Sequence, residues 1–106
     1  MTFDEVRAIA FTLPQVTDGT SYGTPALKAK GKLLVRLRDD IDAIVLPMPF
    51  DQREALMAED PETYFITDHY LAYEYVLAKL SLLHPHQLRD LLAVSYRLVT
   101  RRTPRR

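Results

Sequence analysis

A serine flanked by glycines is the first feature of this sequence that could support catalysis, because residues 19–23 read GTSYG. This string matches the G-x-S-x-G pattern, in which serine hydrolases hold their nucleophile on a sharp turn between a strand and a helix. Here Pro25 and an extended segment follow the serine, and a chain of 106 residues is far below the size of an α/β-hydrolase. Residues 19–23 are therefore interpreted as a turn.

Three histidines, His69, His84 and His86, could supply nitrogen ligands to a metal ion. No H-x-x-x-H or H-E-x-x-H helix face accompanies them, and the chain has no cysteine, so surface or helix-capping histidines are favoured over ligands. The three glycines fit neither G-x-G-x-x-G nor the Walker loop. We therefore expect no catalytic residue, no metal ion and no cofactor, and in particular no nucleotide cofactor.

Basic residues are the strongest candidate for a binding site. Alternate residues of a strand share a face, so the cations of residues 28–38 are expected to project together from one side of a hairpin. Cations on one solvent face would attract the phosphates of a nucleic acid. The alternative is that they only keep an outer sheet face soluble and protect its edge. With the basic end of the chain added, the predicted nucleic-acid-binding residues are Lys28, Lys30, Lys32, Arg36, Arg38, Arg97, Arg101 and Arg102.

The first half of the sequence predicts one helix followed by three strands. A capping box and apolar residues at helical spacing predict a helix over residues 3–12. Turn-forming residues then predict a loop over residues 17–25. Two-residue alternation predicts a hairpin over residues 26–38 and a third strand over residues 43–46.

The second half predicts a short helix over residues 51–58 and strands over residues 63–67 and 72–80. A proline at a first helical position and an apolar stripe predict a final helix from Pro85 to about Arg101. The predicted order is α-β(3)-α-β(2)-α. Because the strands come as hairpin neighbours, we expect a two-layer α+β fold, with an antiparallel-dominated five-stranded sheet and helices packed on one face.

Composition narrows the class of protein further. The chain is 47% hydrophobic and 26% charged, and its 14 Lys and Arg residues balance its 14 Asp and Glu residues. A chain of this size builds one core, so we expect one domain over residues 1–101 and a basic tail over residues 102–106. No stretch approaches the roughly 18 apolar residues of a membrane span. With no cysteine and an acidic start unlike a signal peptide, the cytoplasm is the expected compartment.

Several short strings resemble the MmcQ/YjbR family. They are Leu13-Pro14, Tyr22-Gly23-Thr24-Pro25-Ala26, Gly31-Lys32, Arg53-Glu54-Ala55-Leu56 and Ser95-Tyr96, in the family's order over essentially the whole chain. The resemblance implies an α-β(3)-α-β(2)-α topology, similar to type III secretion chaperones, and DNA binding through a double wing of β-hairpins. It implies no cofactor and no catalytic residue. The sequence departs from the family at Leu27, where an aromatic is common, and at Tyr75, where tryptophan is frequent.

The basic residues and the resemblance together predict a non-catalytic DNA-binding module that contacts phosphates through its basic hairpin. Sequence specificity is expected to be low, because base-edge readout uses Asn, Gln or Arg and this chain has no Asn. The alternative is a protein-interaction or chaperone-like module that forms a homodimer through an exposed sheet face. We therefore expect DNA, a protein or a second copy of the chain as the partner, and not a membrane. The aromatic anchors of the alternative would be Tyr64, Phe65, Tyr70, Tyr73 and Tyr75.

Overall fold

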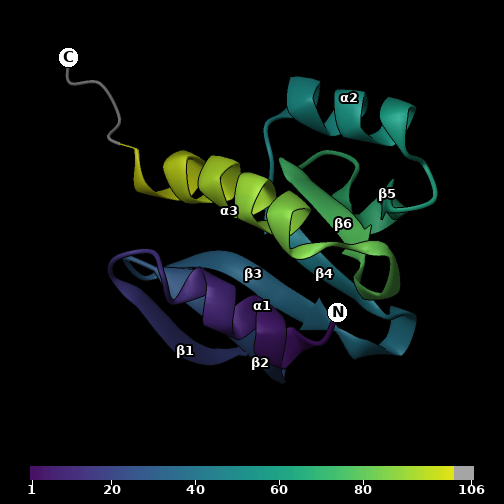
Figure 1. Cartoon of the computed structure of the whole chain (residues 1–106). Helices are drawn as coiled ribbons and strands as arrows, with labels where there is room; N and C mark the ends of the chain where they lie inside the picture. Colours follow the sequence, from purple (N-terminus) through teal and green to yellow (C-terminus); the bar gives the residue numbers. More distant parts are fainter. Residues whose placement is uncertain (102–106) are drawn as a thin grey trace, which may run out of the picture.

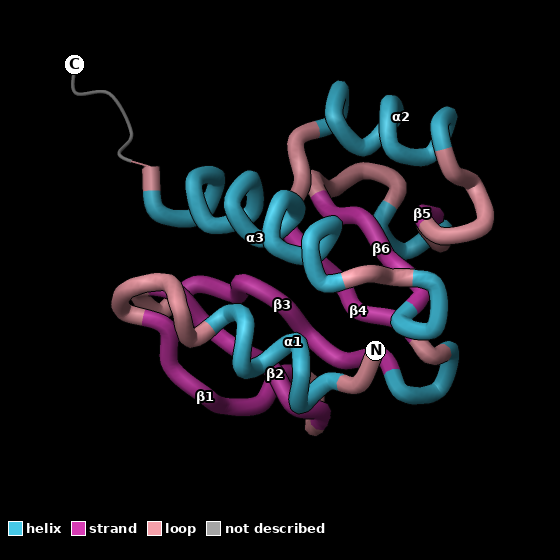
Figure 2. Tube along the Cα trace, in the orientation of Figure 1, coloured by secondary structure: helices cyan, strands magenta, loops and turns pink. Residues whose placement is uncertain are grey.

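A six-stranded antiparallel sheet with helices on one side forms the fold of residues 1–101, which the computed structural model describes (Figure 1; Figure 2). The helices of this part of the chain are α1 (Phe3–Ala10), α2 (Phe50–Glu59) and α3 (Pro85–Thr100). Its strands are β1 (Val16–Ser21), β2 (Thr24–Ala29), β3 (Lys32–Arg38), β4 (Ala43–Pro47), β5 (Tyr64–Phe65) and β6 (Tyr75–Lys79). The predicted α+β class and antiparallel sheet are confirmed. The predicted basic tail, residues 102–106, lies outside the described residues.

The strand order across the sheet is β1-β2-β3-β4-β6-β5, one strand more than the sequence predicts. The missed strand is β1, so the order becomes α-β(4)-α-β(2)-α. It is an edge strand whose inner residues, 17–20, are all exposed, and its sequence VTDGTS has no large apolar residue after Val16. Because neither face of β1 is buried, its residues show no alternation between apolar and polar types, and that alternation is the signal by which a strand is recognised.

Two tight turns join the first three strands. Tyr22 and Gly23 connect β1 to β2 with φ angles of +53° and +77°, and Lys30 and Gly31 connect β2 to β3 with φ angles of +51° and +80°. Two consecutive positive φ angles are the mark of the type I′ turn, whose twist matches that of the flanking strands. The predicted hairpin over residues 26–38 is therefore confirmed, with its turn at residues 30–31.

The apolar core lies between the sheet and the helices α1 and α3, which cover the same face (Figure 1). Fully buried residues meet there from all three elements, including Val6 of α1, Ile44 of β4 and Leu88 of α3. Helix α2 packs instead near β5 and β6, at one end of the sheet (Figure 1). Helix packing on one face is thus confirmed for α1 and α3, and the other face of the sheet remains open to different contacts.

Polar contacts fix the ends of the helices. The predicted capping box is confirmed, since the Glu5 amide donates to the Thr2 hydroxyl at 3.2 Å and the Thr2 amide donates to the Glu5 carboxylate at 2.8 Å. The buried Ser95 hydroxyl of α3 donates to the Pro47 carbonyl at 2.7 Å and so ties this helix to the end of β4.

No helix in residues 1–101 combines the length and the apolar character that a bilayer crossing requires.

Predicted boundaries in the second half need correction. Strand β5 has two residues rather than five, and β6 starts at Tyr75 rather than at residue 72. Residues 66–74 form a loop with a 3₁₀ turn at Asp68–Tyr70, and buried Tyr70 packs with Val45 and Leu77 in a second, smaller apolar cluster. This loop therefore lies over part of the sheet face that the helices leave uncovered.

Candidate ligand-binding site on the open face of the sheet

The face of the sheet turned away from α1 and α3, here called the open face, is defined by strand register. Ala26, Arg36, Val45 and Leu77 are neighbours across four strands, so their side chains share this face. Leu27, Val35, Ile44 and Ala78, one position along each strand, belong to the core under the helices. No strand position on the open face carries a carboxylate in residues 1–101, whereas four carry cations. These are Lys28, Arg36, Arg38 and Lys79.

Arg36 is the most unusual residue of the open face, because its charged side chain is only 8% exposed. One guanidinium nitrogen donates to the Tyr70 hydroxyl at 2.6 Å, and the other donates weakly to the Thr24 hydroxyl at 3.5 Å. The guanidinium carbon also lies 5.2 Å from the centre of the Tyr22 ring. No carboxylate oxygen in residues 1–101 lies within 4.0 Å of it. A buried guanidinium held only by hydroxyls and a ring is rare, since buried arginines are ordinarily paired with an acid.

A cavity of about 350 Å³ opens beside Arg36. Leu33 and Val45 contribute its aliphatic surface. Burial raises the pKa of the Tyr75 hydroxyl above its usual value, so this group stays protonated at neutral pH and is able to donate a hydrogen bond. Aromatic rings and donor groups thus surround one uncompensated cation. The polar and aromatic lining comes from Tyr22, Arg36, His69, Tyr70, Tyr73 and Tyr75, and we call this set the Arg36 pocket.

The loop that forms one wall of the Arg36 pocket is fixed by Arg53 of α2. This side chain is 3% exposed, and its two terminal nitrogens donate to four backbone carbonyls at 2.8 to 3.2 Å. Its Nε has no hydrogen-bond partner, and the guanidinium also stacks 4.8 Å above the Phe50 ring. A single side chain from α2 therefore holds the loop in shape. The four acceptors are the carbonyls of Tyr70, Leu71, Tyr73 and Tyr75.

Tyr70 joins the two buried arginines. Its backbone carbonyl accepts from Arg53 at 3.2 Å, and its hydroxyl accepts from Arg36 at 2.6 Å. Its ring meets His69 edge to face, with ring centres 4.8 Å apart. Arg53 consequently positions the pocket, although it does not line the pocket itself.

Tyr22 reaches the pocket from a strained position. Its φ of +53° lies in the left-handed region, which is uncommon for a bulky aromatic residue, and its side chain is 88% exposed. Residues of this kind concentrate at functional sites, where surrounding structure sustains the strain. The type I′ turn at residues 22–23 thus presents an exposed ring at the pocket rim.

The predicted basic face of the hairpin over residues 26–38 is only partly formed. Register confirms that Lys28, Arg36 and Arg38 share a face, but Arg36 is buried in the pocket rather than exposed. Arg38 is paired with Asp40 through two hydrogen bonds of 3.0 and 2.9 Å. That contact raises the pKa of Arg38 and lowers the pKa of Asp40. The expectation that all these cations project together into solvent was wrong. The alternation of side chains along a strand predicts which face a residue is on, but it does not predict whether the residue is buried or paired with an acid.

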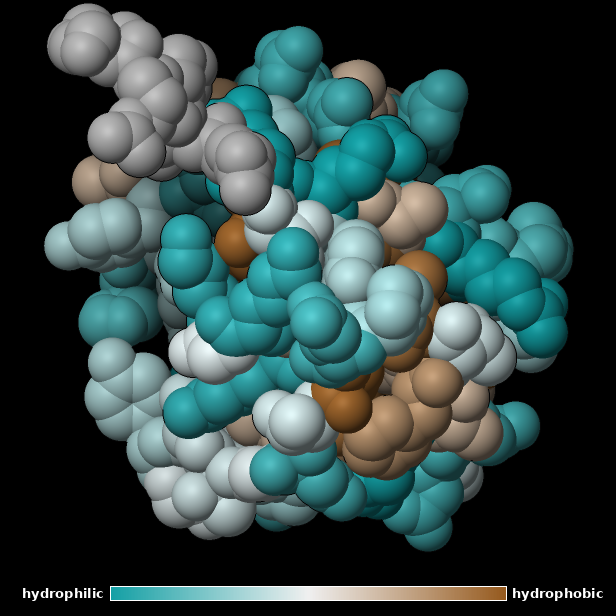
Figure 3. All heavy atoms as spheres, turned by 90° about the vertical axis from the view of Figure 1, so that its left-hand side faces the viewer, coloured by the Kyte–Doolittle hydropathy of each residue, from teal (hydrophilic) through white to brown (hydrophobic). Residues whose placement is uncertain are grey.

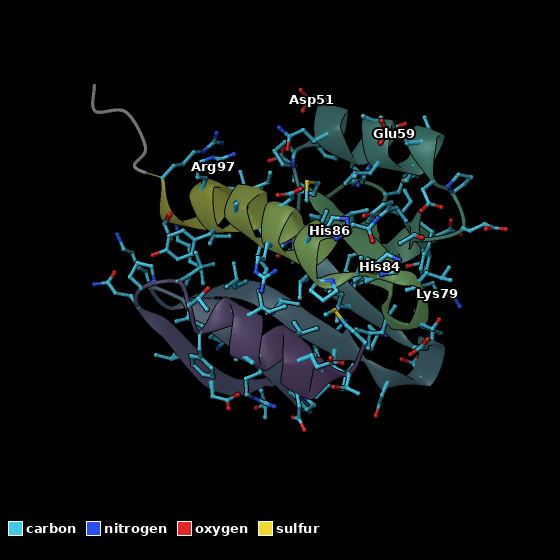
Figure 4. The ribbon with its side chains drawn as sticks, in the orientation of Figure 1. Asp51, Glu59, Lys79, His84, His86 and Arg97 are labelled. Carbon is cyan, nitrogen blue, oxygen red and sulfur yellow. The ribbon has the colours of Figure 1, made fainter. Side chains whose placement is uncertain are left out.

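The remaining predicted cations lie elsewhere. Lys30 is in the turn, and Lys32 pairs in register with Ala29, which faces the helices, so Lys32 is on the other side of the sheet. Arg97 is in the last turn of α3, far from Lys79 in Figure 4, and Arg101 is the C-cap of the same helix. Figure 1 places the β2–β3 turn at the same end of the molecule as this end of α3. Arg102 lies outside the described residues.

The other sequence candidates also have definite places. Ser21 ends β1 and is followed by a two-residue turn and a strand, so the predicted turn is confirmed for residues 22–23 only and residues 19–21 belong to β1. His84 precedes α3 as its N-cap, and its ring stacks on that of His86 with centres 5.8 Å apart (Figure 4). No three His, Cys, Asp or Glu residues of the described chain come together as a metal site. Of the aromatic anchors in the alternative function, Tyr64 and Tyr70 are buried and cannot serve as surface anchors.

These features define a class: a small α+β domain with one helix-covered sheet face and one open face that carries a tyrosine-lined arginine. Within that class, the chain belongs to the YjbR family, whose model matches residues 11–98, and the resemblance seen in the sequence is confirmed. No curated protein gives a significant match. The crystal structure of Deinococcus radiodurans protein DR2400, a DUF419 domain, is similar with a TM-score of 0.80 and 22% identity. The match covers 94% of this chain and 79% of that chain, and at this identity it shows the fold alone.

The structure gives physical roles to the strings that carried the resemblance. Gly23 and Gly31 occupy the left-handed positions of the two turns. Ser95 ties α3 to β4, and the Tyr96 hydroxyl donates to the Pro14 carbonyl at 2.8 Å. Arg53 organises the pocket loop. The sequence does not identify Tyr22 and His69 as pocket residues. His69 stands out there only as a possible metal ligand, and the one signal for Tyr22 is its position directly before a turn glycine.

Proposed function

We propose that this protein is a non-catalytic nucleic-acid-binding module that holds single-stranded DNA or RNA against its open face. The observation that carries the proposal is the group of tyrosines around Arg36, placed on a sheet face whose strands present cations and no carboxylates. Aromatic rings on a basic surface bind unpaired bases by stacking, which contributes about 1–3 kcal/mol per base. The family's proposed double-wing mode is thereby refined, because the contact surface is the sheet face rather than the tip of a basic hairpin.

Unpaired strands fit this surface better than a duplex does. Stacking requires the face of a base, and a duplex exposes only base edges in its grooves. Tyr22 and Tyr73, which are 88% and 59% exposed, offer ring faces at the rim of the pocket. Lys28 and Lys79 lie on the same sheet face and would contact phosphates on either side. Tyrosine hydroxyls both donate and accept, so they distinguish bases weakly and low sequence specificity is expected.

The test is fluorescence anisotropy with a short labelled oligothymidine strand and the corresponding duplex at two salt concentrations. We expect the single strand to bind at least about tenfold more tightly than the duplex. The logarithm of the binding constant should fall with log salt by a slope of about −2, as for roughly three phosphate contacts to a single strand. Tyr73→Ala should lower the affinity at least about fivefold through lost stacking.

Leu71→Ala is the matched control for this experiment. Leu71 is 61% exposed on the same loop but does not line the pocket, so its truncation should change the affinity less than about twofold. An equal effect of Tyr73→Ala and Leu71→Ala, or no binding of the single strand at all, would overturn the proposal.

Self-association through the open face is the second candidate, since Tyr22, Leu71 and Tyr73 are large hydrophobic side chains exposed around the pocket. Figure 3 shows a different side, the end of the molecule at which α3 finishes, where hydrophilic residues surround hydrophobic ones gathered from the centre to the lower right. Light scattering discriminates the two candidates. A salt-insensitive dimer that Tyr73→Ala dissociates would favour self-association over nucleic-acid binding.

A further inference from the structure

We infer that the Arg36 pocket holds one nucleotide as a unit, with its phosphate on the Arg36 guanidinium and its base against the tyrosine rings. This inference rests on the proposed function and specifies which part of the nucleic acid enters the pocket. It also predicts that a free nucleoside monophosphate binds the protein on its own.

Arg36 has more hydrogen-bond donors than the described residues satisfy. A guanidinium carries five N–H donors, and residues 1–101 offer Arg36 hydrogen-bond acceptors only at the Tyr70 and Thr24 hydroxyls. A buried cation without an acid is unfavourable by itself, so the site is complementary to an anionic group from outside. Phosphate is well suited to this role because guanidinium binds it through paired, charge-assisted hydrogen bonds.

No carboxylate of residues 1–101 forms an ion pair with Arg36. The charge of Arg36 is the weakest of the causes that lower the Asp40 pKa, and the hydrogen bonds from Arg38 are the strongest. Both Asp40 carboxylate oxygens are taken by Arg38, at 3.0 and 2.9 Å. Arg38 thus keeps the neighbouring carboxylate occupied and leaves Arg36 available.

The cavity beside Arg36 has the size and lining that one nucleotide requires. Its volume of about 350 Å³ falls near the lower end of the range of about 300–1,000 Å³ that is typical of ligand pockets, which suits one nucleotide better than two. Four tyrosines and a histidine line it, so the ligand carries a flat ring as well as an anion. With one uncompensated cation and no metal cluster in residues 1–101, the pocket suits a single phosphate rather than a triphosphate with its magnesium ion.

Chemical-shift titration of the ¹⁵N-labelled protein tests the inference with four probes: thymidine 5′-monophosphate, thymidine, inorganic phosphate and benzoate. We expect the monophosphate to perturb amides of residues 22–24 and 69–75, and to bind at least about tenfold more tightly than thymidine or phosphate. It should also displace a labelled single strand. Benzoate separates a nucleotide site from one for aromatic acids in general, and binding as tight as that of the monophosphate would overturn the nucleotide assignment.

Arg36→Gln should weaken monophosphate binding about tenfold or more, to the level of thymidine. Lys32→Gln is the matched control, because it removes one cation from the same strand on the opposite side of the sheet and should leave monophosphate binding unchanged. Circular dichroism checks that each variant is folded. Tyr73→Ala is a second variant that keeps the charge and should weaken the monophosphate but not inorganic phosphate.

The outcomes separate this inference from the proposed function. If the single strand binds equally well to the wild type and to Arg36→Gln, and the monophosphate does not bind, the pocket assignment is wrong and the nucleic-acid function stands. If the monophosphate binds through Arg36 but the single strand does not, the pocket assignment stands and the nucleic-acid function is wrong.

Discussion

Arg53 and Arg36 are two buried guanidiniums with opposite surroundings. They are 3% and 8% exposed, yet Arg53 donates to four backbone carbonyls and Arg36 only to two hydroxyls beside a cavity. Three of the carbonyls around Arg53 belong to one loop and the fourth, that of Tyr75, begins β6, so that arginine completes the fold. Arg36 instead retains unused donors that face a space large enough for a ligand. Equal burial therefore goes with a structural role in one case and a binding role in the other, and the difference lies in the partners.

The two regions are connected through Tyr70, whose carbonyl accepts from Arg53 and whose hydroxyl accepts from Arg36. Loss of Arg53 should consequently disturb both regions, whereas loss of Arg36 should disturb only the pocket. This asymmetry makes the comparison testable by substitution.

The largest effect is expected from Arg53→Met. Four carbonyls would lose a charged donor in a buried place, and hydrogen bonds to charged groups contribute about 1.5–3 kcal/mol each, not additively. We expect the free energy of unfolding to fall by about 3 kcal/mol, measured by urea denaturation followed by circular dichroism. Arg53→Lys should restore part of the loss. A loss under about 1 kcal/mol would show that the loop keeps its shape without this residue.

Arg36→Met should have a much smaller effect on stability. Replacing a buried charge that lacks an acidic partner by an apolar side chain is often neutral or stabilising, so we expect a change within about 1 kcal/mol in either direction. Ligand binding should nevertheless be lost. If the same denaturation experiment gave Arg36→Met a loss equal to that of Arg53→Met, the two arginines would have the same structural role and the comparison would fail.

This contrast also explains what could be predicted from the sequence. Periodicity identifies the helices and the buried strands, because Leu88 and Leu92 or Ile44 and Leu46 repeat at the spacing of their elements. The alternation of residues along a strand correctly predicted that Lys28, Arg36 and Arg38 share one face of the sheet. The burial of Arg36 depends instead on a loop over thirty residues away in sequence, since its partner Tyr70 is 34 positions along the chain. Local patterns carry no information about such contacts.

The turns allow a finer comparison of the two hairpins. Tyr22 and Lys30 occupy equivalent left-handed positions before glycine, where asparagine is favoured. Lys30→Asn should raise the free energy of unfolding by about 1 kcal/mol as strain is relieved. Tyr22→Asn should raise it by only about 0.5 kcal/mol, because it also removes the ring over Arg36. Thermal denaturation of both variants measures the difference. An equal gain in the free energy of unfolding would show that the contact of the Tyr22 ring with Arg36 contributes nothing to stability.

The smallest effect concerns Asp40, which separates Arg38 from Arg36. Hydrogen bonds from Arg38 lower the Asp40 pKa in the folded protein, so this pair stabilises the fold above the carboxyl's unfolded pKa and the contribution is lost as the pH falls through the folded pKa. In Arg38→Gln the Asp40 pKa, measured by NMR titration, should rise toward its usual value. Arg36→Met should shift it less, because the charge of Arg36 is the weaker cause. A pKa that stays low in Arg38→Gln would mean that Arg36 has captured the carboxylate. Arg36 would then have an acidic partner within the chain, and it could not be the phosphate-binding residue of the pocket.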